Sequence, residues 1–243
     1  MRDDWFDKGV SCVRSHSYDS ALYCFGKVID GDPMNASAWS NKGYVQSSQG
    51  RDEDAIECYI RATEIDPNYS VAWYNMGNAL SRLGRYEEAD DCYERVVEID
   101  PLSEAAWVNK GLSLRCLGRY EEAIECYDTS LRLYPTNPIT WMDKGTAVAK
   151  MGLYEEAIRC FEIAIELDPS PIFAWINKGS AFGCMKKHEE SLRCFERAIE
   201  ISPECGIAWE SKAIALRALR RFSEAEEADA LAKKLGLDIN NQI

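Results

Sequence analysis

Apolar residues between Trp73 and Pro101 recur at two separate sets of helical positions. They lie three or four residues apart, first at Trp73, Gly77 and Leu80 and then at Tyr86, Ala89, Tyr93 and Val97, a spacing that places side chains on one face of a helix. Gly84 lies between the two sets, where glycine can end a helix in the left-handed conformation. Pro101 closes the second set because proline disfavours helical geometry in the residue before it. The stretch therefore predicts a helix–turn–helix hairpin, which cannot bury both of its apolar faces alone.

The same pattern returns along nearly the whole chain. Tryptophan occurs once every 34 residues without an insertion, at Trp5, Trp39, Trp73, Trp107, Trp141, Trp175 and Trp209. The order of tryptophan, helix glycine, alanine, aromatic residue and proline at this period resembles the tetratricopeptide repeat family. The resemblance implies an all-α superhelix, a solenoid of seven 34-residue helix–turn–helix repeats. We predict one domain over residues 2–239, with repeats at 2–35, 36–69, 70–103, 104–137, 138–171, 172–205 and 206–239 and a tail at 240–243.

The last repeats depart from this pattern. Lys186 and Arg220 stand where the turn glycine is expected in repeats six and seven, and Ala213 replaces the helix glycine in repeat seven. The end unit of a solenoid has one face without a neighbour, so polar changes there are typical of a cap. We predict that a second helix near residues 222–235 forms this cap and stops at Gly236.

A glycine occupies the same internal helix position in six repeats: Gly9, Gly43, Gly77, Gly111, Gly145 and Gly179. Glycine inside a helix costs about 1 kcal/mol relative to alanine, so we expect that the missing β-carbon allows a close approach. The predicted neighbour is the small residue of the second helix, for example Ala89 opposite Gly77.

The net charge of −13 argues against nucleic acid or an anionic membrane as the main partner. Many of the acids, such as Glu87 and Glu88, follow the turns, where the helix dipole favours them without any partner. No apolar run is long enough for a membrane span or a secretory signal. We therefore expect no membrane association.

Six of the ten cysteines share one position in the second helix: Cys24, Cys58, Cys92, Cys126, Cys160 and Cys194. Packed helices lie about 8–10 Å apart, whereas a disulfide needs α-carbons within about 7 Å. We therefore predict buried free thiols and a cytoplasmic, reducing environment. No CxxC motif or paired cysteine and histidine spacing indicates a metal site, and we expect neither metal nor cofactor.

Lysine precedes the helix glycine position in six repeats: Lys8, Lys42, Lys110, Lys144, Lys178 and Lys212. A lysine can lay its methylene groups over apolar surface while its ammonium group reaches water. We favour this interpretation because the column adjoins the tryptophans. The alternative is a basic stripe for an acidic ligand.

In the family that the chain resembles, the first helices line a concave groove that binds peptides or segments of partner proteins. Transferred by repeat phase, the resemblance implies a groove formed by Asn41, Asn75, Asn109, Asn177, Tyr44, Tyr74, Asn78, Arg82, Leu112, Arg115 and Lys150, together with Phe6, Val108, Met142, Phe173 and Ile176. A column of asparagines can pair with the backbone of an extended chain. Alternatively, these amides form hydrogen bonds inside the hairpin. Aromatic and arginine side chains are the types that anchor interfaces.

Enzyme motifs are absent from the sequence. It has only two histidines, His16 and His188, and no glycine-rich phosphate loop, G-x-S-x-G or H-E-x-x-H. We therefore predict a non-enzymatic scaffold or adaptor that binds an extended peptide segment of a partner protein. The alternatives are a self-assembling structural protein, a homo-oligomer formed through its terminal repeats or its groove, and a recognition subunit of an enzyme complex.

Overall fold

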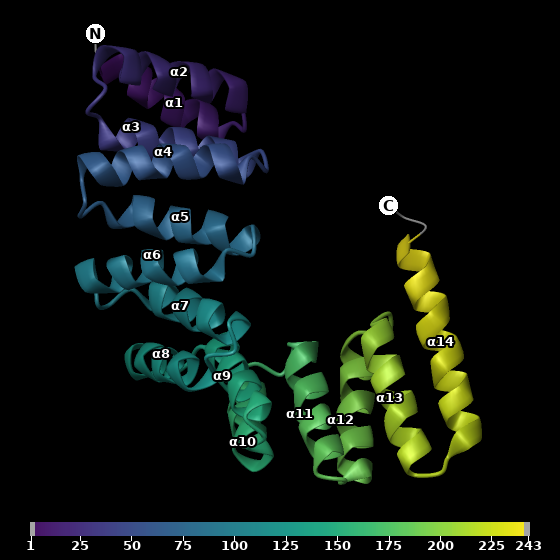
Figure 1. The fold of residues 1–243 in the computed structure, drawn as a ribbon. Helices are drawn as coiled ribbons and strands as arrows, with labels where there is room; N and C mark the ends of the chain where they lie inside the picture. The colour runs from purple at the N-terminus through teal and green to yellow at the C-terminus, as the bar shows by residue number, and fades with distance from the viewer. Residues whose placement is uncertain (1–2, 241–243) are drawn as a thin grey trace. The chain divides into compact units, whose positions relative to one another are not determined.

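The computed structural model describes the backbone of residues 3–240 and the side chains of residues 5–236. Over this range the chain forms fourteen helices and no strand (Figure 1). The helices are α1 (Asp3–Arg14), α2 (Tyr18–Gly31), α3 (Ala36–Ser48), α4 (Asp52–Ile65), α5 (Ser70–Arg82), α6 (Tyr86–Ile99), α7 (Glu104–Cys116), α8 (Tyr120–Leu133), α9 (Pro138–Lys150), α10 (Tyr154–Leu167), α11 (Ile172–Cys184), α12 (His188–Ile201), α13 (Gly206–Ala218) and α14 (Phe222–Asn240). They form seven helix–turn–helix pairs, so the predicted all-α fold of seven repeats is confirmed. The first predicted repeat residue, Arg2, and the tail residues 241–243 lie outside the described residues.

The chain divides into two compact units, Met1–Cys126 and Tyr127–Ile243. In unit 1, α1 to α7 pack in chain order, and in unit 2, α9 to α14 do the same (Figure 1). Within each unit the first helices of neighbouring repeats also contact each other, as α3 contacts α5 and α11 contacts α13. Neighbouring second helices make no such contact among the described residues. The first helices therefore form the inner face of each unit. The single domain over residues 2–239 stays a prediction.

The turns between paired helices require a left-handed residue. Glycine supplies it in four repeats, at Gly50, Gly84, Gly118 and Gly152, with φ between 75° and 80°. In the other three repeats a residue with a β-carbon takes the same conformation: His16 at φ 55°, and Lys186 and Arg220 at φ 61°. The predicted role of the turn glycine is confirmed, and its absence from three turns leaves local backbone strain there.

The helix glycines make the predicted close approach to the second helix, and the atoms nearest to them belong to its aromatic ring. A β-carbon on Gly77 would lie 2.7 Å from Cε1 of Tyr93, and the aromatic residue of the second helix is equally close to Gly9, Gly145 and Gly179. At Gly43 the backbone oxygen of Ala55, one of the predicted small residues, also lies 3.0 Å from the β-carbon position. The flat ring, rather than the small residue one turn earlier, covers the glycine because it projects further from its helix.

Each tryptophan from the second repeat onward is tied to the end of the preceding repeat. Its indole Nε1–H donates a hydrogen bond of 2.8–3.2 Å to the carbonyl oxygen of the proline six residues earlier. The pairs are Trp39–Pro33, Trp73–Pro67, Trp107–Pro101, Trp141–Pro135, Trp175–Pro169 and Trp209–Pro203. The two most regular residues of the repeat therefore act together to fix how the chain enters each first helix.

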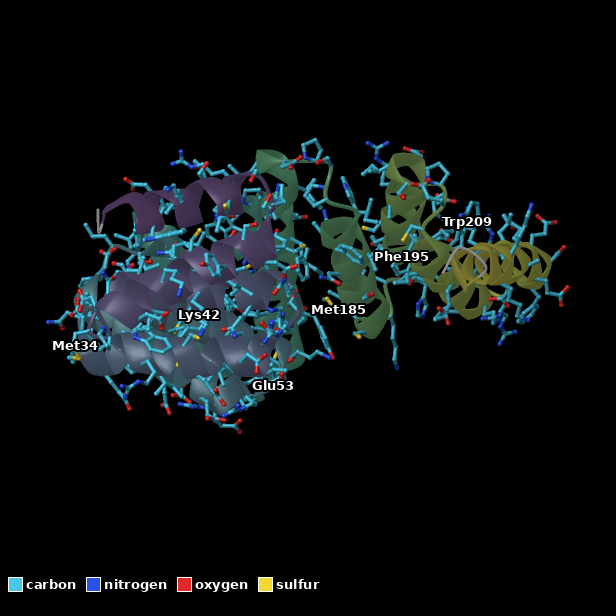
Figure 2. The ribbon with its side chains drawn as sticks, turned by 90° about the horizontal axis from the view of Figure 1, so that it is seen from above. Met34, Lys42, Glu53, Met185, Phe195 and Trp209 are labelled. Carbon is cyan, nitrogen blue, oxygen red and sulfur yellow. The ribbon has the colours of Figure 1, made fainter. Side chains whose placement is uncertain are left out.

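The lysine column packs over the tryptophans, as expected. The ammonium group lies 5.0–6.0 Å from the ring centre of the tryptophan in its own repeat, within the range of a cation–π interaction. Lys42, labelled in Figure 2, is one example. In the last four repeats the lysine also forms an ion pair with the acid sixteen residues earlier: Lys110–Glu94, Lys144–Asp128, Lys178–Glu162 and Lys212–Glu196. These carboxylates already neutralise the lysines, which disfavours the basic-stripe alternative.

The six cysteines of the repeated position are buried, and all ten cysteines carry free thiols. Burial raises the pKa of Cys58 to about 11 and that of Cys92 to about 12. Such thiols stay protonated at neutral pH, so they pack as small apolar side chains.

The end of α14 corrects one prediction. We expected Gly236 to stop this helix, but α14 continues through it to Asn240. Gly236 has no neighbour within 4 Å of its β-carbon position and does not take a left-handed conformation. A glycine permits a helix to end but does not force it, and nothing packs against this position to turn the chain.

Candidate functional site

The predicted site residues lie on the first helices, which line the inner face of each unit. Most of them follow the tryptophan of their repeat by two, five or nine residues, as Asn75, Asn78 and Arg82 do on α5, whereas Tyr74 follows by one residue and Arg115 by eight. Residues at these offsets lie three or four positions apart and share one helix face. The structure therefore brings Asn41, Tyr44, Tyr74, Asn75, Asn78, Arg82, Asn109, Leu112 and Arg115 to the first helices of unit 1, and Lys150 and Asn177 to those of unit 2.

A hydrogen-bonded polar cluster joins two of these helices in unit 1. Asn109 on α7 donates from Nδ2 to the hydroxyl oxygen of Tyr74 at 3.1 Å and to Oδ1 of Asn78 at 3.0 Å, both on α5. Tyr93 on α6 donates to the same Oδ1 of Asn78 at 2.8 Å. The rings of Tyr74 and Tyr93 meet edge to face. The cluster holds Asn109 in a fixed orientation and uses its amide nitrogen.

The other asparagines of the column differ from one another. Asn177 donates from Nδ2 to Oγ1 of Thr146 at 3.2 Å. This bond in unit 2 is equivalent to the bond from Asn109 to Asn78, two repeats earlier. Asn41 instead donates to the carbonyl oxygen of Ser37 in its own helix. Asn75 is half-buried and makes no hydrogen bond through its side chain within the described residues. The bond of Asn41 lies inside its own hairpin, as in our alternative, whereas Asn109 and Asn177 bond to the first helix of the preceding repeat.

Arg82 does not present a free charge to the inner face. It forms a two-pronged ion pair with the buried carboxylate of Asp52 at the start of α4, with N–O distances of 2.9 and 2.7 Å, and also donates to the hydroxyl of Ser47. The hydrogen bond from Arg82 holds the pKa of Asp52 below its ordinary value. The sequence contained a signal for this pair, because Asp52 stands where the other second helices begin with an aromatic residue or histidine.

The remaining predicted residues vary in exposure. Tyr44 and Lys150 are exposed, whereas Leu112 and Arg115 are half-buried. Lys150 forms no ion pair with the described part of the chain. Tyr44 and Lys150 are therefore the predicted residues best placed to meet a ligand.

A pocket of about 320 Å³ lies on the inner face of unit 2, and none of the predicted residues lines it. It is formed by Ser180, Gly183 and Cys184 of α11, Ser211, Ile214, Ala215 and Ala218 of α13, and His188, Ser191 and Phe195 of α12. We call it the α11–α13 pocket. Repeat phase was a signal that could have found it, because Ser180 and Ile214 occupy the position of Tyr44, and Cys184 and Ala218 that of Arg82.

Charge is divided between the two kinds of helix. The first helices α3, α5, α7, α9, α11 and α13 contain only three acids, Glu104, Asp143 and Glu210. Their bases are Lys42, Arg82, Lys110, Arg115, Lys144, Lys150, Lys178, Lys212 and Arg217. A second helix such as α6 is acidic by contrast, with Glu87, Glu88, Asp90, Asp91, Glu94 and Glu98. Apart from α1, which contains Asp3, Asp4 and Asp7, the first helices therefore carry more bases than acids, and most of the negative charge lies on the second helices.

The described residues contain no group of three or more histidine, cysteine, aspartate or glutamate side chains that could hold a metal ion. Among the helices between residues 3 and 240, none has the length and apolar character to span a membrane.

Comparison with protein families gives two matches. The model of the tetratricopeptide repeat matches residues 70–101, 104–137, 138–171 and 172–205, and a model described as a TPR repeat matches residues 47–84. No curated protein has a significantly similar sequence.

Solved structures share the fold. A tetratricopeptide repeat protein from Parabacteroides merdae ATCC 43184, 18% identical in sequence, matches with a TM-score of 0.77 over 97% of this chain and 93% of that chain. YrrB, described as a TPR protein with an unusual peptide-binding site, is 25% identical and matches with a TM-score of 0.67 over 77% of this chain and 97% of its own. MamA is 24% identical and matches with a TM-score of 0.66 over 70% of this chain and 92% of its own.

Proposed function

Since the chain belongs to the tetratricopeptide repeat family, a family of protein-interaction modules, we propose that it is a non-enzymatic scaffold or adaptor. In this proposal an extended segment of a partner protein lies along the inner face of a unit, in contact with its first helices. Tyr44 and Asn75 make contacts of this kind in unit 1, and Lys150 makes them in unit 2. The similarity to YrrB, which has a peptide-binding site by its description, supports the proposal.

The observation that carries the proposal is the exposure of large apolar side chains on the first helices. Ile139, Phe173 and Ile207 each stand two residues before the tryptophan of their repeat and are 57%, 50% and 54% exposed. Exposed apolar surface in a regular row is typical of an interaction site. Packed helices lie about 8–10 Å apart, and an extended chain rises about 3.3 Å per residue. In an extended partner segment, about every third residue can therefore contact the next repeat along the inner face.

Several features support a role without catalysis in the cytoplasm. The buried thiols with raised pKa values are poor nucleophiles at neutral pH. Ten free thiols suit a reducing compartment.

The test compares matched variants of the full chain. The partner is captured with the purified protein, its bound segment is mapped by mass spectrometry, and affinity is measured by calorimetry. Tyr44→Ala and Asn75→Ala should each weaken binding, because they remove inner-face contacts. Tyr23→Ala is the control, because Tyr23 is similarly exposed but lies on the second helix α2. Asn109 is less suitable, because its loss would also break the link between α5 and α7.

Unchanged affinity in both inner-face variants, combined with a loss of binding in Tyr23→Ala, would refute the inner-face proposal. Melting temperatures of the variants, measured in parallel, separate a lost contact from a lost fold.

Self-assembly is a second candidate, favoured by one observation. The last helix, α14, exposes Phe222 and Leu231, and an apolar side chain at a solenoid end can contact another copy. Sedimentation velocity over a wide concentration range tests this candidate. A strictly monomeric protein would exclude it, and Phe222→Glu should lower any self-association.

A further inference from the structure

The α11–α13 pocket lies at the turn end of the first helices of unit 2. The turn between α11 and α12 is preceded by Gly183 and Cys184 and followed by His188, all three of which line the pocket. Ala218, which also lines it, is the last residue of α13, before the turn to α14. Met185, labelled in Figure 2, belongs to the first of these turns, and Phe195, also labelled there, is a buried wall of the pocket. The pocket lining is mainly apolar or small, and the exposed side chain of Ile214 lies at its side. Its volume suits one large apolar side chain.

The two turns beside this pocket carry basic residues where glycine would be free of strain. Lys186 and Arg220 both have φ of 61°, whereas the equivalent residue of the preceding repeat is Gly152 with φ of 80°. Strained backbone of this kind motivates the hypothesis that the two side chains have a function. Both side chains add positive charge next to the pocket.

These charges are not used inside the protein. Lys186, Lys187 and Arg220, which we call the basic turn cluster, are exposed and form no ion pair with the described residues. Neighbouring bases are neutralised instead, Arg217 by Asp229 and Arg221 by Glu224. Glu189 and Glu190, at the start of α12, form no ion pair with Lys186, Lys187 or Arg220.

The opposite edge of the same face is apolar. Ile139, Phe173 and Ile207 stand near the starts of α9, α11 and α13, at the helix ends remote from these turns. The inner face of unit 2 thus has an apolar edge, a pocket and a basic edge. The chain has a net charge of −13 and would repel an acidic partner over most of its surface. The basic edge of unit 2 is a surface that attracts such a partner instead.

We propose that the inner face of unit 2 binds an acidic segment of a partner protein, which places one large apolar side chain in the α11–α13 pocket and its carboxylates against the basic turn cluster. The proposal rests on the scaffold function proposed above and names the chemistry of the partner. Apolar contact fixes the position of the segment, and the opposite charges at the rim select it.

The test uses the full chain and labelled synthetic peptides, with binding measured by fluorescence anisotropy. One peptide is acidic with a single central leucine, one is acidic with serine in its place, and one is basic with the same leucine. The acidic leucine peptide should bind most tightly, the basic peptide should not bind, and added salt should weaken binding.

Two variants separate charge from fold. Lys186→Gly with Arg220→Gly removes two charges and also relieves the strained turns, so this variant should fold at least as well as the parent. Its affinity for the acidic leucine peptide should fall by about tenfold or more, the change that 1.4 kcal/mol produces. The control is Arg159→Gln with Arg193→Gln, which removes the same charge from exposed positions on the second helices α10 and α12 and should leave affinity unchanged.

A third variant tests the pocket. Ala218→Leu partly fills it, so this variant should bind the acidic leucine peptide no better than it binds the serine peptide. Equal affinity of the parent for the acidic and basic peptides, failure of the acidic peptide to bind, or full affinity in the double glycine variant would each overturn this inference. The scaffold proposal would still stand in those cases if the captured partner requires Tyr44 and Asn75, which lie in unit 1.

Discussion

Replacing Gly77 with alanine should destabilise unit 1, although alanine is the better helix former. The new β-carbon would lie 2.7 Å from Cε1 and 2.9 Å from Cζ of Tyr93, inside van der Waals contact. Tyr93 is only 1% exposed, and its hydroxyl donates to Asn78, so the ring cannot move aside without losing this bond. Overpacking costs about 1–3 kcal/mol and the hydrogen bond about 1 kcal/mol, against a gain of about 1 kcal/mol in helix propensity. The expected net loss is about 1–3 kcal/mol.

Urea unfolding followed by circular dichroism measures this loss. Gly26→Ala is the matched control, because Gly26 lies inside α2 and no atom lies within 4 Å of its β-carbon position. This control should gain up to about 1 kcal/mol from propensity and from the reduced entropy of the unfolded chain. If Gly77→Ala unfolds at the same or a higher urea concentration than the parent while Gly26→Ala behaves as expected, ring packing does not explain the glycine.

Three further predictions follow from local contacts. Lys186→Gly should raise the free energy of unfolding by about 1 kcal/mol, because the left-handed backbone penalty exceeds the added entropy of glycine in the unfolded chain; a lower melting temperature would contradict this. A double-mutant cycle of Lys144→Met and Asp128→Ala should give a coupling energy of about 0.5–1 kcal/mol that falls at high salt, and a value of zero at low salt would argue against the pair. The ion pair with Arg82 lowers the pKa of Asp52 in the folded state. The ion pair therefore stabilises the folded protein fully above the ordinary carboxyl pKa of about 4, and this stabilisation is lost as the pH falls through the lower pKa of the folded state. Asp52→Asn should therefore flatten the acid side of the plot of stability against pH, and an unchanged slope would refute the assignment.

The sequence by itself determined the helices, the turns and the repeat, because these depend on contacts close along the chain. The 34-residue period of tryptophan and the alternation of apolar faces predicted each helix–turn–helix pair. Turn glycines such as Gly84 were identifiable because a left-handed residue is a local requirement. The buried thiols and the lysines over the tryptophans were predicted for the same reason, since their neighbours lie in the same repeat.

Only the tertiary structure decided which side chains meet between packed helices. Arg82 had the spacing of a groove cation, yet it is paired with Asp52, thirty residues earlier in the preceding repeat. The atoms nearest to the β-carbon position of Gly77 belong to the ring of Tyr93, because the reach of a side chain between packed helices is not encoded in spacing. The α11–α13 pocket exists because small residues on two first helices face each other above Phe195. A period in sequence predicts which residues share a face, but the contents of that face depend on side-chain volumes and charges from helices that meet only after packing.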